Sequence, residues 1–170
     1  MIPLVLVLTT LAFRALGALG VRRFATWPAS AAHGMAVMLL FTASAHFVPA
    51  DVTAMPNHAD MVRMVPPFLP FADSLVYLTG VLELLGAAGL VITVTRWTAG
   101  YALAALFVAL LPANIHAAVA DVPFAGGEAT PLWQRIPEQI LYLAVAVWVA
   151  RTATRAPLAN HAEPKENVYS

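Results

Sequence analysis

The chain has 170 residues, of which 61% are hydrophobic and only 11% are charged, and its nine basic and nine acidic residues cancel. A soluble domain of this size needs more charge on its surface, and a disordered chain has less apolar content. The balanced charge gives no general attraction for nucleic acid, and the absence of cysteine excludes disulfides and thiol chemistry. These numbers indicate an all-α, polytopic membrane protein.

Five apolar stretches follow one another along the chain, and each has close to the roughly 20 residues that cross the hydrocarbon core of a membrane. Their apolar residues are continuous rather than alternating, so we expect helices rather than strands. The first stretch contains Arg14 and is followed by further arginines, which favours a membrane helix over a signal peptide. The expected spans are Ile2–Val21, Ala29–Val48, Ala72–Val94, Thr98–Ala120 and Leu132–Ala150. We therefore predict a five-helix transmembrane domain over 1–151 and a polar, disordered tail over 152–170.

Basic residues predict the orientation of this domain. One side of a five-span chain receives six of them, namely Arg22, Arg23, Arg96, Arg151, Arg155 and Lys165. The other side receives Arg63 and Arg135, together with Asp51, Asp60, Asp121 and Glu128. Since basic residues gather on the cytoplasmic side, we expect a multi-pass protein of the cell inner (plasma) membrane with its N-terminus outside and its C-terminus in the cytoplasm.

The one long connection, Asp51–Phe71, contains a short helical pattern before a proline-rich end. Met55, His58, Met61 and Met64 recur every third residue. We interpret this pattern as an amphipathic helix on the outer membrane surface. The alternative is a Cu(I) site, but ligands spaced by three residues spread over about half of the helix surface, which disfavours copper.

Glu83 is the candidate catalytic residue because it is predicted near the middle of the membrane, where ionisable groups are costly and usually face the bundle interior. Tyr77, Gly80 and Ala87 share its helix face, and the small residues allow another helix to approach closely. The alternative is a structural carboxyl. One possible partner is Arg14, predicted at a similar depth, although Arg14 can instead extend toward the cytoplasmic surface.

Further polar side chains are predicted near the outer ends of three helices, where we expect an outward-facing polar pocket. Pro112 is predicted to bend the fourth span just before two of them. Asn114 and His116 lie about 200° apart on an ideal helix, so we expect only one of them to face inward. We predict no metal site, because no two ligands have the i, i+4 spacing. The candidate binding residues are His46, Tyr77, Asn114, His116, Arg135, Glu138 and Gln139.

The order of these motifs resembles the DoxX family of small bacterial and archaeal membrane proteins, especially its DoxX-like branch. The resemblance covers Met38–Val149 and lies in His46-Phe47, Pro66–Pro70, Leu75–Gly80 with Glu83, Pro112–His116 and Arg135–Gln139. It implies a four-helix core, to which the first helix is an addition. It also implies an association with membrane oxidoreductases that use quinones.

We therefore expect a subunit of, or accessory to, a membrane oxidoreductase that binds a quinone-like or other lipophilic molecule in the polar pocket. Its partners would be the lipid bilayer and other membrane subunits or further copies of itself. The alternative is a stand-alone membrane enzyme in which Glu83 donates or accepts a proton on a lipophilic substrate. A proton-coupled carrier is the third possibility, which the short chain without visible repeats disfavours. A quinone is the cofactor class that fits, whereas nothing marks a haem or copper site.

Overall fold

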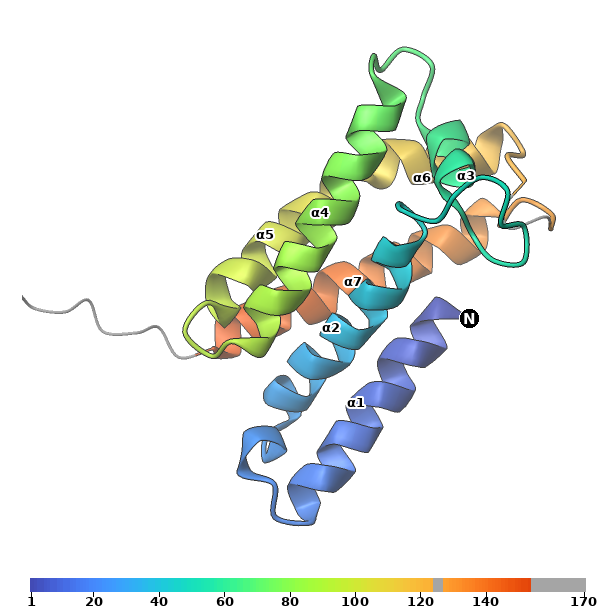
Figure 1. Ribbon diagram of the computed structural model, residues 1–170. Helices are drawn as coiled ribbons and strands as arrows, with labels where there is room; N and C mark the ends of the chain where they lie inside the picture. Colours follow the sequence, from blue (N-terminus) through green and yellow to red (C-terminus); the bar gives the residue numbers. More distant parts are fainter. Residues whose placement is uncertain (124–126, 154–170) are drawn as a thin grey trace, which may run out of the picture.

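The computed structural model describes residues 1–123 and 127–153, and this part of the chain is helical and contains no strand (Figure 1). The predicted tail therefore lies almost entirely outside the described residues. The helices, in chain order, are α1 (Ile2–Ala18), the short 3-10 helix η1 (Arg22–Phe24), α2 (Trp27–Ser44), α3 (His58–Met64), α4 (Ala72–Val91), α5 (Arg96–Ala109), α6 (Leu111–Val119) and α7 (Leu132–Thr152).

The five expected stretches all form helices, with ends within a few residues of the predicted bounds. Two segments of the described chain, Ala72–Val91 and Arg96–Val119, are both long and apolar enough to cross a membrane. The second is formed by α5 and α6 together. Its break lies beside Pro112, which lacks the backbone N–H that a continuous helix requires, so the predicted bend is confirmed.

The short helix predicted in the long connection is also present, as α3. Asn57 caps its start by accepting a hydrogen bond from the backbone N–H of Asp60, whose side chain in turn accepts from the backbone of Asn57. Three prolines and Phe71, which has a left-handed backbone conformation, separate α3 from α4.

The helices pack in a simple order, with α2 at the centre. It contacts α1 on one side and α4 and α7 on the other, while α5 packs between α4 and α7. Helix α1 lies at the edge of the molecule against α2 (Figure 1). The largest fully buried side chains belong to the helices around this core and are Met35, Met38, Leu39, Leu90, Leu103 and Val149.

One end of the bundle gathers the arginines, and we call it the arginine end. Arg23 donates hydrogen bonds to His33 Nε2 and to the Val91 carbonyl, both at 3.0 Å, so the turn after α1 is held against the end of α4. Arg96, the first residue of α5, lies at the turn between α4 and α5 and donates to the Leu90 carbonyl at 2.8 Å. The end of α7, with Arg151, packs near the start of α5, because a Cβ on Gly100 would lie 2.8 Å from the Ala150 Cβ.

The opposite end carries the acidic residues, and we call it the acidic end. It comprises α3, the start of α4, the end of α6 and the start of α7 (Figure 1). Its acidic side chains among the described residues are Asp51, Asp60, Asp73, Asp121, Glu128 and Glu138.

Candidate functional site

Glu83 lies in the middle of α4 and faces α2, as the small residues on its helix face predict. It is only 5% exposed. The hydroxyl of Thr42, from α2, donates a hydrogen bond of 2.6 Å to Glu83 Oε2. The remaining carboxyl oxygen, Oε1, lies 3.7 Å from His46 Nε2. A carboxyl and an imidazole that are both buried thus face each other between two helices.

The surroundings of His46 determine which of its nitrogens carries a proton. Its Nδ1 lies 2.7 Å from the backbone carbonyl of Val76 in α4. A carbonyl can only accept, so Nδ1 carries a hydrogen and donates it. The Nε2 nitrogen that faces Glu83 is therefore the position where His46 gains or loses a proton.

Gly80 makes this pairing possible, because it lies one turn before Glu83 on the same face of α4. A Cβ at this position would lie 2.6 Å from the Cβ of His46. Real Cβ contacts are longer than this, so only glycine lets α4 approach the end of α2 so closely. The position of His46 thus depends on a residue with no side chain of its own.

His58, the first residue of α3, links this pair to the acidic end. Its Nδ1 donates to the backbone carbonyl of His46 at 2.8 Å, and its Nε2 lies 3.3 Å from Asp73 Oδ1. The imidazole stacks on Tyr77, with ring centroids 4.1 Å apart. Of the predicted binding residues, His46 and Tyr77 therefore gather with Glu83 between α2, α3 and α4.

Arg135 and Asn114 form a second group, between α6 and α7. Arg135 is 7% exposed, although it lies in the first turn of α7. Its Nη1 donates to Asn114 Oδ1 at 3.1 Å, and its Nε donates to the Thr130 carbonyl at 3.0 Å. The arginine thus fixes α6 to the start of α7.

The other two polar candidates at this end have separate contacts. Glu138 accepts a hydrogen bond of 3.1 Å from Gln134, one turn earlier on α7. His116 lies 3.1 Å, through Nδ1, from the Met64 carbonyl of α3. Asn114 and His116 therefore both contact neighbouring elements, α7 and α3 respectively, whereas only one of them was expected to face inward.

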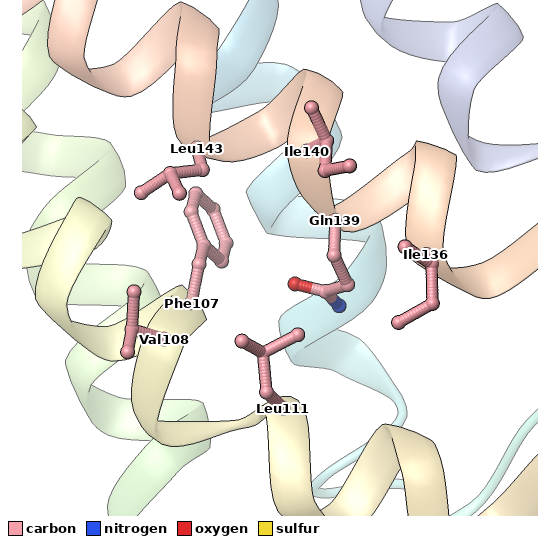
Figure 2. Close-up of a pocket in the computed structure, with 7 residues that line it drawn as sticks. All are labelled: Phe107, Val108, Leu111, Ile136, Gln139, Ile140 and Leu143. Atoms are coloured by element: carbon pink, nitrogen blue, oxygen red, sulfur yellow. The ribbon is translucent and has the colours of Figure 1, made fainter.

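Gln139 belongs to neither group, because its side chain enters an apolar groove between α5 and α7 (Figure 2). The groove has a volume of about 150 Å³. Gln139 Oε1 is buried and has no hydrogen-bond partner. The other residues that line the groove are Phe107, Val108, Leu111, Ile136, Ile140 and Leu143.

Tyr142 adds a second buried polar atom beside this groove. Its ring packs against Phe107, with centroids 5.9 Å apart, and its hydroxyl also has no hydrogen-bond partner. A buried polar atom without a hydrogen-bond partner lowers the stability of the folded protein, so its presence in the native structure calls for an explanation. Tyr142 was not among the residues predicted from the sequence, although its spacing of three residues from Gln139 places both on one helix face.

The groove and the buried pair lie at a similar depth in the bundle. Gly86 packs against Leu103, and α4 and α5 run antiparallel. Glu83 lies about one turn before Gly86, and Phe107 lies about one turn after Leu103, so Glu83 and Phe107 come to the same level. The polar groups therefore form three sites: the Glu83–His46 pair, the Arg135–Asn114 contact and the groove around Gln139.

The described residues contain no cluster of three or more histidine, cysteine or acidic side chains that could hold a metal ion. The methionine and histidine pattern considered for copper is also dispersed. Met61 and Met64 pack in a small apolar cluster with Ala117 and Val122, while His58 is engaged with His46 and Asp73. These contacts agree with the interpretation of α3 as an amphipathic helix.

Comparison with known proteins gives one match. A family described as a domain of unknown function (DUF8561) matches residues 35–150, from within α2 to near the end of α7. This range contains all of the candidate site residues and leaves α1 outside it. No curated protein and no solved structure matches the chain.

Proposed function

The chain belongs to this DUF8561 family, and we propose that it is a five-span membrane protein that binds a quinone-like or other lipophilic molecule in the groove between α5 and α7. The proposal combines two parts, the location in a membrane and the ligand. Each part rests on separate observations.

The outward surface of the helices supports the membrane location. Large apolar side chains are exposed along α1 and α4, among them Leu4, Leu8, Leu78 and Leu85, each more than half exposed. Charged residues gather at the two ends, and three of the four tryptophans, Trp27, Trp97 and Trp148, lie toward the arginine end. Apolar sides, arginines at one end and tryptophans at the interfaces suit a bilayer with the arginine end in the cytoplasm.

The observation that carries the ligand proposal is the unpartnered Oε1 of Gln139 in an otherwise apolar groove. Ligand sites typically combine apolar walls with a few polar groups that orient the ligand. The Gln139 amide can accept a hydrogen bond from a hydroxyl or donate one to a carbonyl. A quinol carries the first group and a quinone the second, and the apolar walls suit their hydrocarbon parts.

The resemblance to the DoxX family supports the same ligand class and adds a partner. Quinones are the substrates of the oxidoreductases with which that family is associated. We propose that this chain acts beside such an oxidoreductase, as an accessory subunit that holds quinone or quinol in the membrane.

The test is a binding titration in detergent with a short-chain quinone in its oxidised and reduced forms. Replacing Gln139 by leucine removes the polar group and keeps the groove apolar. We expect Gln139→Leu to weaken binding of one form or both by about tenfold to a hundredfold, the value of a buried hydrogen bond. Its melting temperature should not fall, because the amide has an unsatisfied oxygen in the unliganded protein.

Gln134→Leu is the matched control, because it makes the same change on the same helix outside the groove. It should bind quinone as the parent chain does. Equal affinity of the parent chain and Gln139→Leu for both forms would contradict the proposal.

A further inference from the structure

The pairing of Glu83 with His46 is separate from the groove. Both side chains are almost fully buried, at 5% and 6% exposure, Glu83 in α4 and His46 in the turn that follows α2, in segments that we place within the membrane. Ionisable groups at such positions usually serve proton or ion movement, because a purely structural role is cheaper with apolar residues. We infer that Glu83 and His46 bind one exchangeable proton between Glu83 Oε1 and His46 Nε2.

The hydrogen bonds around the pair leave one position for this proton, between His46 Nε2 and Glu83 Oε1. Nδ1 of His46 is committed to the Val76 carbonyl, and Oε2 of Glu83 accepts from Thr42. This leaves Nε2 and Oε1 facing each other at 3.7 Å. One proton on Oε1 gives two neutral groups, and the same proton on Nε2 gives an ion pair. The gap is longer than a hydrogen bond, and a small side-chain rotation or one water molecule closes it.

His58 and Asp73 are the ionisable side chains on the outer side of this pair. The side chain of Asp73 is 76% exposed, whereas that of His58 is 14% exposed. His58 donates through Nδ1 to the backbone carbonyl of His46, and its Nε2 lies 3.3 Å from Asp73 Oδ1. The hydroxyl of Thr79 lies 3.4 Å from His46 Nδ1 and adds a polar group beside the buried ring.

Other charged groups on the neighbouring helices have contacts elsewhere. Arg14 of α1 lies over Trp27, and Arg96 of α5 donates to the Leu90 carbonyl, both toward the arginine end. On α7, Arg135 contacts Asn114 and Glu138 contacts Gln134. On α3, Arg63 pairs with Asp60. The titration of the pair is therefore governed by Glu83 and His46 themselves, with His58 and Asp73 on the outer side.

The test is infrared spectroscopy of the full chain in detergent, which detects the C=O stretch of a protonated carboxyl group. We expect a buried carboxyl band that titrates with pH and is lost in Glu83→Gln. His46→Asn keeps a donor at the Nδ1 position and removes Nε2, so it should shift the titration of this band. His46→Gln is the second variant. It keeps a polar atom near the Nε2 position and instead alters the group that donates to the Val76 carbonyl. A band that is absent, or that titrates identically in the parent chain and both His46 variants, would overturn the pairing.

Discussion

Arg14 and Glu83 are ionisable residues predicted at similar depths, and the structure gives them separate partners. The Arg14 guanidinium lies 5.5 Å from the centre of the Trp27 ring, at the arginine end. Glu83 instead contacts Thr42 and His46. Of the two alternatives for Arg14, extension toward the arginine end therefore agrees with the structure, and a cation–π contact contributes about 0.5–2 kcal/mol there.

This separation predicts that the two residues contribute independently to stability. Arg14→Met and Glu83→Gln each change the free energy of unfolding by removing a different contact. Their effects should add within about 0.5 kcal/mol in the double variant, as for residues without shared partners. Unfolding of the parent chain, the two single variants and the double variant in detergent measures whether the two free-energy changes add. A coupling well above this value, with the double variant more stable than the single ones predict, would show that Arg14 and Glu83 interact.

For Glu83, the sequence predicts which way the side chain faces but not which residue it contacts. That Glu83 faces the interior follows from the helix face it shares with Gly80 and Ala87. That it meets His46 depends on the rotation of α2 relative to α4, and helical periodicity does not determine this rotation. Gln139 is a similar case, because its spacing from Arg135 suggested a shared polar pocket, whereas the structure directs it into the apolar groove.

Among the elements, α2 and α4 form the contact on which the buried pair depends. Gly80 is where they come closest, beside His46. The ends of the helices were predictable, because prolines, glycines and polar residues bound the apolar stretches. The break between α5 and α6 was also predictable from Pro112, but the side-chain contacts across helices were not.

Gly80→Ala tests the contact between α2 and α4. The added methyl group forces His46 or α4 to move, and overpacking of this kind costs about 1–3 kcal/mol. We expect the melting temperature in detergent to fall by several degrees and the carboxyl band of Glu83 to shift. Leu78→Ala, on the exposed side of the same helix, should change both far less. A Gly80→Ala protein as stable as the parent chain, with an unchanged band, would show that the close approach at Gly80 is not required.

At the scale of the whole molecule, the described chain has apolar sides, an arginine end and an acidic end. The turn after α1, the turn between α4 and α5 and the end of α7 all lie at the arginine end. The connection before α3, the end of α6 and the start of α7 lie at the acidic end (Figure 1). The sequence predicts that successive connections lie at opposite ends, because hydropathy indicates the number of spans and the positions of the arginines indicate their orientation.

Accessibility of single cysteines in intact cells tests this arrangement most directly, because the chain has no cysteine of its own. A membrane-impermeant thiol reagent should label Thr53→Cys and Glu128→Cys, at the acidic end, and should leave Val21→Cys, Val94→Cys and Thr152→Cys unlabelled until the membrane is permeabilised. All five positions are exposed on the protein, so burial does not account for protection. This alternation along the chain is the result expected of five spans with the arginine end in the cytoplasm. Labelling of Val21→Cys or Thr152→Cys on the same side as Glu128→Cys would contradict five spans, and the fully reversed pattern would contradict the orientation.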